Sequence, residues 1–222
     1  MRLLDLFCGA GGAAVGYHRA GFEVVGVDIE PQPNYPFKFH QGDALEILAH
    51  YEHGDHPLGR FDVIHASPPC QGYSVTASLH DAEYPELVDD VRWYLERIGL
   101  PYVIENVVGA PLRNATRLCG SSFGLGVRRH RLFETSPVMI GAPQCAHHLQ
   151  PEPIDVTGTG GPSGAPRSPG GGLHRKPRNL AHAREVMGID WMTRPELSEA
   201  VPPAFTEWIG SQLAHLQAEV PA

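Results

Sequence analysis

The sequence lacks the long apolar stretch that a membrane protein needs. Its apolar runs are only a few residues long, although 42% of its 222 residues are hydrophobic. A spanning helix needs about 20 consecutive apolar residues. The first residues, Met1 to Asp5, are typical of a strand and not of a charged region followed by an apolar targeting segment. The sequence therefore predicts a soluble, cytoplasmic protein without a membrane partner.

Cysteine is also scarce. The four cysteines, at positions 8, 70, 119 and 145, form no C-x-x-C pair and are too few for a disulfide framework in a chain of this length. We therefore expect reduced thiols. Length and hydrophobic content fit one compact domain, with or without a small appendage, and exclude a coiled coil, a collagen and a wholly disordered chain.

Positive charge is scarce overall but concentrated in the middle of the chain. The formal net charge is -8, yet residues 1–112 sum to -10, residues 113–184 to +7 and residues 185–222 to -5. Because phosphate attraction depends on the local field, the basic middle third predicts a surface that contacts nucleic acid. An ordinary solvated basic face is the alternative. The candidate phosphate contacts are Arg113, Arg117, Arg128, Arg175, Lys176 and Arg178.

Short apolar runs alternate with amphipathic stretches in the first 110 residues, which predicts a doubly wound α/β domain with a parallel sheet. Between residues 157 and 172, 10 of 16 residues are glycine or proline, which predicts a loop. The expected strands span residues 2–7, 23–28, 61–66 and 102–105, and the expected helices span residues 13–20, 84–98, 179–187 and 204–216.

A glycine-rich segment, residues 5–12, lies between the first expected strand and helix, and Asp28 ends the second strand. Glycines let the backbone approach a ligand closely, and a carboxylate at that place can accept hydrogen bonds from both ribose hydroxyls. The spacing is neither the dinucleotide G-x-G-x-x-G nor a P-loop, so S-adenosylmethionine fits better than a nicotinamide cofactor or ATP. A tight turn that needs glycine for packing alone is the alternative.

Two further strands end in reactive side chains. Cys70 follows the apolar strand 61–66 in the sequence Pro68-Pro69-Cys70, and Glu105 ends the apolar strand 102–105. The carboxyl ends of strands hold the ligand crevice in an open α/β sheet, so we expect both side chains at the chemistry. A buried structural cysteine and a helix cap or ion-pair partner are the ordinary alternatives.

Together these segments resemble the DNA cytosine-5 methyltransferase family, from residue 2 to about residue 213 except for the Gly/Pro-rich insert. The small size and the short middle region resemble phage-encoded members. The matching motifs are DLFCGAGG at residues 5–12, Asp28, Gly42-Asp43, PPCQGYS at residues 68–74, ENV at residues 105–107, RRHRLF at residues 128–133, EVMG at residues 185–188 and AVPPA at residues 200–204.

The resemblance implies methyl transfer from S-adenosylmethionine to carbon 5 of a cytosine rotated out of double-stranded DNA. By resemblance Cys70 is the nucleophile, Glu105 the acid that contacts N3, Arg131 the contact to O2 and Arg129 its support. The family's pattern has glutamine at Val127 and asparagine near Glu199. The implied cofactor residues are Phe7, Gly9, Gly11, Gly12, Asp28, Ile29, Pro69, Asp43 and Ala44.

The expected fold is thus a doubly wound, Rossmann-like α/β methyltransferase sheet with a very small target-recognition insert. We expect a catalytic domain over residues 1–135, the insert over 136–178 and completing helices over 179–222. No obligate protein partner is evident. The alternatives are an RNA cytosine-5 methyltransferase and a non-catalytic DNA-binding relative.

The start of the insert contains candidate zinc ligands. Cys145, His147 and His148 lie together, with His174 and His182 downstream. Zinc could stabilise so small a unit, but no second regularly spaced pair accompanies the cluster. The sequence therefore predicts no metal, and it predicts passive roles for Cys8 and Cys119.

Overall fold

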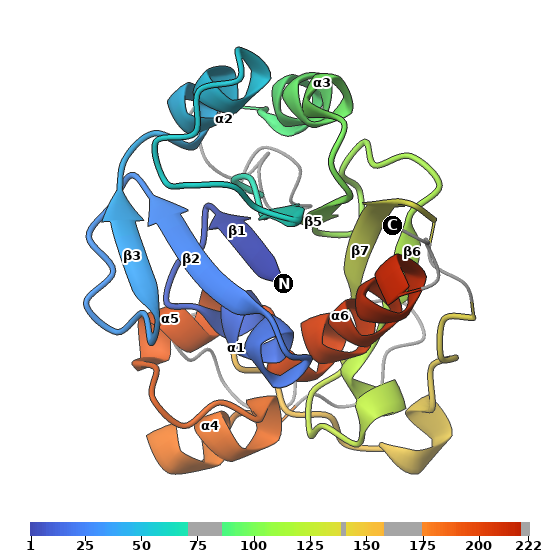
Figure 1. Cartoon of the computed structure of the whole chain (residues 1–222). Helices are drawn as coiled ribbons and strands as arrows, with labels where there is room; N and C mark the ends of the chain where they lie inside the picture. Colours follow the sequence, from blue (N-terminus) through green and yellow to red (C-terminus); the bar gives the residue numbers. More distant parts are fainter. Residues whose placement is uncertain (71–85, 139–140, 158–174, 219–222) are drawn as a thin grey trace.

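Seven strands form one sheet in the order β3-β2-β1-β4-β5-β7-β6 in the computed structural model, which describes residues 1–70, 86–138, 141–157 and 175–218 (Figure 1). Strands β1 to β5 are parallel, whereas β7 is antiparallel to both β5 and β6. The strands are β1 (Arg2–Leu6), β2 (Glu23–Asp28), β3 (Lys38–Gln41), β4 (Val63–Ala66), β5 (Tyr102–Asn106), β6 (Thr116–Leu118) and β7 (Arg131–Ser136).

Helices cover both faces of the sheet, α1 and α6 on one and α2 and α3 on the other (Figure 1). Successive strand residues point to opposite faces, so Leu3 packs with the α1/α6 side and Leu4 with the α2/α3 side. This arrangement confirms the predicted doubly wound α/β fold. The helices are α1 (Gly12–Arg19), α2 (Ala44–Glu52), α3 (Val88–Ile98), α4 (Leu180–Met187), α5 (Arg194–Glu199) and α6 (Pro203–Ala218), with short 3-10 turns η3 (Gly120–Phe123) and η4 (His147–Leu149).

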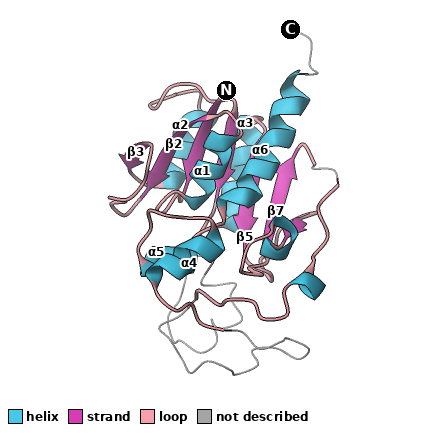
Figure 2. Cartoon of the chain, turned by 90° about the horizontal axis from the view of Figure 1, so that it is seen from below, coloured by secondary structure: helices cyan, strands magenta, loops and turns pink. Residues whose placement is uncertain are grey.

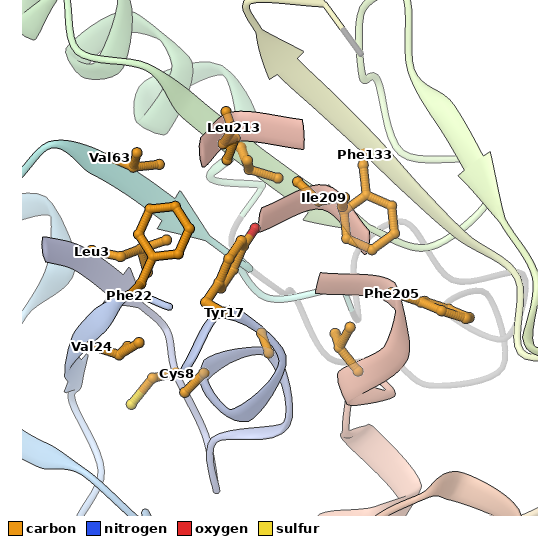
Figure 3. Packing of buried hydrophobic residues seen from close by; sticks show 14 of the residues in the cluster. Leu3, Cys8, Tyr17, Phe22, Val24, Val63, Phe133, Phe205, Ile209 and Leu213 are labelled. Atoms are coloured by element: carbon orange, nitrogen blue, oxygen red, sulfur yellow. The ribbon is translucent and has the colours of Figure 1, made fainter. Parts of the chain in front are cut away.

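Aromatic side chains fill the space between α1, α6 and the sheet (Figure 3). Tyr17 packs edge-on against Phe22 with ring centroids 6.0 Å apart, and Phe133 of β7 meets Phe205 of α6 at 6.2 Å. Helix α1 also approaches α6 very closely, since a Cβ on Gly16 would lie 2.0 Å from the hydroxyl oxygen of Thr206. This contact fixes the helix that follows the glycine-rich loop.

The carboxyl-terminal helices α4 and α5 pack at the end of the sheet where the glycine-rich loop lies (Figure 2). Met187 and Leu197 are fully buried there with Ala10, and the indole nitrogen of Trp191 donates a hydrogen bond of 2.8 Å to the Ala10 carbonyl. The segment from α4 to α5 thus helps to build the same edge of the sheet. The division of the chain at residues 135 and 178 stays a prediction.

The expected strands and helices agree with the observed ones to within a few residues at each end. No apolar run predicted α2, β3, α5 or β6, and β7 was indicated only by the resemblance of residues 128–133 to the family's arginine strand. Strand β3 is mostly exposed, so it lacks the apolar run that marked the others. The expected loop 157–172 lies outside the described residues apart from Thr157, as do the first two residues of the helix expected over 84–98. Among the described helices, none is both long and apolar enough to cross a membrane.

A buried ion pair ties α3 to β7, and its loss should be costly. Arg92 is 1% exposed and donates hydrogen bonds of 2.8 Å to both carboxylate oxygens of Glu134. Replacing Arg92 with methionine leaves that carboxylate buried and unpaired, so we expect the free energy of unfolding to fall by about 3–5 kcal/mol. Urea titration measures this loss. In the control Lys38→Met, which removes the exposed pair with Glu23, the loss should stay below about 1 kcal/mol.

Candidate active site

A cavity of about 640 Å³ opens at the carboxyl ends of β1, β4 and β5. This is the edge at which open α/β sheets bind ligands. Both halves of the chain contribute to its wall. The lining residues include Phe7, Cys8, Gly9, Ala10 and Gly12 after β1, Asp28, Ile29 and Glu30 after β2, Ser67 to Cys70 after β4, Glu105 of β5, Arg131 of β7, and Met192, Glu196, Glu199, Ala200 and Val201 near the carboxyl terminus.

The loop after β1 owes its shape to left-handed backbone and to Asp28. Phe7 has φ 55° and Gly9 has φ 48°, and a non-glycine residue in this region is uncommon and often marks a functional site. One carboxylate oxygen of Asp28 accepts a hydrogen bond of 2.9 Å from the Gly9 amide, and the other accepts one of 3.0 Å from the Glu30 amide. Asp28 therefore orders the loop while it faces the cavity.

Six of the nine cofactor residues expected from the sequence line this cavity, namely Phe7, Gly9, Gly12, Asp28, Ile29 and Pro69. Gly11, Asp43 and Ala44 do not. A Cβ on Gly11 would lie 2.7 Å from Pro36, so this glycine is needed for packing. Asp43 caps α2 by accepting a hydrogen bond of 2.7 Å from the Leu45 amide, and Ala44, the first residue of that helix, is buried in the core.

Three of the four expected catalytic residues, Cys70, Glu105 and Arg131, meet in the same cavity. The pairing of β5 with β7 brings Arg131 to Glu105, with the guanidinium Nε 2.9 Å from a carboxylate oxygen. The side-chain amide of Asn106 donates a hydrogen bond of 3.0 Å to the Pro68 carbonyl. That bond holds the loop carrying Cys70 against the end of β5.

Arg129, the fourth expected residue, does not line the cavity. Its backbone has φ 31°, and its guanidinium donates a hydrogen bond of 2.6 Å to the Ser198 carbonyl. Arg129 thereby joins the start of β7 to the end of α5, which fits the supporting role that the resemblance implies. Val127 is buried with α4, whereas Glu199 lines the cavity.

Burial changes the acid–base behaviour of Glu105 and Cys70. Burial raises the pKa of Glu105, although Arg131 opposes the change. The pKa of Cys70 is raised too, chiefly by burial, and Arg131 again opposes the shift while Glu105 adds to it. The environment therefore favours a protonated carboxyl group beside a thiol, with one guanidinium able to stabilise either anion.

A buried polar network behind Glu105 was not expected from the sequence. His65 is fully buried in β4, and its ring nitrogens hydrogen-bond to the Tyr17 hydroxyl at 3.0 Å and to the Ser67 hydroxyl at 2.9 Å. Burial lowers the pKa of His65 to about 3, so this ring is neutral. Ser67 in turn hydrogen-bonds to Glu105. A histidine inside an otherwise apolar strand was the available signal.

The wall of the cavity is strongly acidic. Its described residues include six carboxylates, those of Asp5, Asp28, Glu30, Glu105, Glu196 and Glu199, against the single cation Arg131. Burial raises the pKa of Asp5 well above its ordinary value, as it does for Glu105, so these two contribute less negative charge than the rest. The remaining field favours a ligand with positive charge and disfavours a phosphate.

The strand order and the cavity at the carboxyl ends of β1, β4 and β5 define a class, the Rossmann-like α/β proteins with a ligand site at this edge of the sheet. Residues 1–109 match the family model described as C-5 cytosine-specific DNA methylase. The resemblance to the DNA cytosine-5 methyltransferase family, based above on the motifs, is thereby confirmed.

Individual relatives agree with this assignment. The chain is 32% identical over 129 residues to the Type II methyltransferase M.AgeI of Thalassovita gelatinovora, a match that covers 49% of this chain and 28% of that protein. The matches thus span about a quarter to about half of the length of these curated relatives.

Solved structures share the fold over nearly the whole chain. A DNA modification methyltransferase encoded within an E. coli prophage aligns with a TM-score of 0.64 at 18% identity, covering 99% of this chain and 100% of that one. The S. pombe Dnmt2 methyltransferase aligns with a TM-score of 0.58 at 12% identity, covering 97% and 99%. The compact, phage-type architecture expected from the sequence has a counterpart in the first of these.

Proposed function

We propose that this protein transfers a methyl group from S-adenosylmethionine to carbon 5 of a flipped cytosine in double-stranded DNA, through a covalent bond between Cys70 and carbon 6. The main support for the proposal is that Cys70, Glu105 and Arg131 line the same cavity as the loop after β1. A phage-encoded enzyme of this kind would act in the cytoplasm of its bacterial host.

The cavity fits the proposed cofactor in size and charge. Its volume of about 640 Å³ lies within the range of small-molecule sites, about 300–1,000 Å³. S-adenosylmethionine supplies an electrophilic methyl group on a positively charged sulfur. The acidic wall favours that cation, Asp28 stands where ribose hydroxyls can donate to it, and Gly9 leaves open space around its Cα.

Each proposed catalytic residue has its own role in the reaction of the cytosine. Carbon 5 of cytosine is a poor nucleophile until a thiolate adds at carbon 6, and the addition needs the charge that develops at N3 to be neutralised. Cys70 supplies the sulfur, and Glu105 donates a proton toward N3. Arg131 then stabilises the carboxylate that remains. After methyl transfer, water takes the carbon 5 proton, the Cys70 sulfur leaves carbon 6 and the proton on N3 returns to Glu105, so that the ring is restored.

The proposal is tested by expressing the full chain in a bacterial host and sequencing 5-methylcytosine in the host DNA. Methylation in a fixed sequence context supports it. Methyl transfer to tRNA in preference to duplex DNA would instead select an RNA cytosine-5 methyltransferase. Cofactor binding without transfer to either nucleic acid would select a non-catalytic relative.

Replacing Asp28 with asparagine should weaken binding of S-adenosylmethionine by about 1.5–3 kcal/mol, the range for hydrogen bonds to a charged group. Asparagine keeps the shape and one acceptor oxygen for the loop amides but loses the charge. Calorimetry on the folded variant measures the change. The matched control is Asp62→Asn on the opposite side of β1, which accepts from the Arg2 amide at 2.7 Å and should leave the affinity unaltered. Equal affinity for wild type and Asp28→Asn would refute the ribose contact.

The structure narrows the choice of DNA contacts in the basic middle third. Arg175 pairs with Glu152 at 2.7 Å, and Lys176 is held at 3.1 Å by Asp155 with only 15% of its side chain exposed. Arg113 pairs with Glu96. Arg117 and Arg178 are exposed, and within the described ranges neither forms an ion pair with an acidic residue.

These two arginines therefore make the sharper test. DNA affinity should fall with salt by a log–log slope of about -0.9 per phosphate contact, so Arg117→Gln with Arg178→Gln should flatten the slope by up to about 2 units. Fluorescence anisotropy over a salt series measures the slope. Arg60→Gln, in the acidic first third, serves as the control. If the double variant keeps the wild-type slope, these charges only solvate the surface.

A further inference from the structure

Two cysteines and two histidines from separate parts of the chain gather beside the start of β7. Cys119 follows β6, His130 precedes β7, and Cys145 and His147 come from the segment after β7. One donor atom from each of the four lies within 4.8 Å of all the others. Neither Cys119 nor His130 was associated with a metal by the sequence, and His148 is not part of the group.

The geometry of the group matches the needs of one ion. The Cys119 sulfur lies 3.3 Å from the His147 Nε2, and the Cys145 sulfur lies 3.5 Å from the His130 Nε2. Zinc at about 2.3 Å from sulfur and about 2.0–2.1 Å from nitrogen places tetrahedral ligands about 3.3–3.8 Å apart. These two sulfur–nitrogen distances therefore already suit a tetrahedral zinc site. Each of the other distances between donor atoms would have to shorten by no more than about 1.5 Å.

The group also has the right chemistry for zinc. Two thiol sulfurs with two imidazole nitrogens form one of the common closed donor sets of structural zinc sites. All four cysteines are free thiols in the structure, so Cys119 and Cys145 remain available as ligands. We infer that Cys119, His130, Cys145 and His147 bind one structural zinc ion.

The ion would add a link between the residues before β7 and the segment that follows it. His130 stands between Arg129 and Arg131, while Cys145 and His147 lie in the expected target-recognition insert, 136–178. The existing links between these parts of the chain are hydrogen bonds, such as the one of 3.0 Å from the Ala146 amide to the Ser121 hydroxyl. Zinc would thus hold the first residues of β7, and with them Arg131, against the insert.

The experiment measures the metal directly. The full chain, purified without a histidine tag, is analysed for bound elements by plasma mass spectrometry and then titrated with Co²⁺ after removal of metal. We expect about one zinc per chain, with Co²⁺ giving the visible bands of a tetrahedral site and thiolate charge-transfer absorption. Cys145→Ser and His147→Ala should each lower the zinc content at least several-fold. Cys145 and His147 are only partly buried, so both variants should fold, which circular dichroism checks.

Two controls separate this site from chance and from catalysis. His148→Ala, next to the cluster, should retain full zinc, and so should Cys70→Ala, which removes the proposed nucleophile. A folded wild-type chain that carries no zinc and gives no thiolate bands with Co²⁺ overturns the inference. Zinc retained in both Cys145→Ser and His147→Ala overturns this ligand set, and a Cys119–Cys145 disulfide under reducing purification does so as well.

Discussion

Replacing Cys70 with alanine is expected to abolish covalent capture of DNA that contains 5-fluorocytosine. On the proposed mechanism, the Cys70 thiolate of the wild-type chain adds to carbon 6 and the methyl group of S-adenosylmethionine arrives at carbon 5. Fluorine at carbon 5 cannot leave as a proton does, so the sulfur stays bonded to the base. Denaturing gel electrophoresis should show a shifted band for the wild type and none for the variant.

Binding must be measured separately, because a variant that no longer holds DNA would also lose the band. Cys70→Ala should keep DNA affinity within a few-fold of wild type, since the basic residues proposed to contact phosphate lie elsewhere on the chain. Cys8 is the competing thiol, for it lines the same cavity. It is 7% exposed, and its amide donates to the Val27 carbonyl at 3.1 Å at the cofactor end. A band that persists in Cys70→Ala would move the nucleophile to another cysteine.

The residues that end parallel strands were the most predictable part of the site. Cys70 and Glu105 could be placed because each follows an apolar run, and such runs become neighbouring strands with their carboxyl ends at one edge. The position of Arg131 beside Glu105 rested on the family resemblance alone. It depends on the antiparallel pairing of β5 with β7, a non-local contact that no short pattern encodes.

Asp43 and Gly11 were expected to bind the cofactor, but each has an ordinary local role in the structure. Asp43 precedes an apolar helix, and an aspartate at that position is a common helix cap, which is the role seen for it in the structure. Gly11 serves packing against Pro36, the ordinary reason for a glycine in a tight turn. The cysteine–histidine cluster was missed because its members are separated by 10, 14 and one residues, so only the sheet edge brings them together.

Replacing Glu105 with glutamine should lower the methyl-transfer rate by about 10²–10⁴-fold, the usual contribution of a positioned general acid. Glutamine fits the same space and can still hydrogen-bond, but it has no proton to give to N3. Burial raises the pKa of Glu105, which keeps the wild-type group in the acid form to higher pH than an exposed glutamate. Single-turnover transfer from labelled S-adenosylmethionine measures the step without product release.

Comparing Glu105→Gln with a variant of Arg131 shows whether Glu105 acts as a general acid or has only a structural role. If Glu105 only anchored Arg131, with which it pairs at 2.9 Å, Arg131→Met should lower the rate as much as Glu105→Gln and the double variant should be no slower. If Glu105 is the acid, Glu105→Gln should be the slower of the two single variants. Glu96→Gln on the exposed side of α3 controls for the loss of one carboxylate. A Glu105→Gln rate within a few-fold of wild type would mean that the proton reaches N3 from another group.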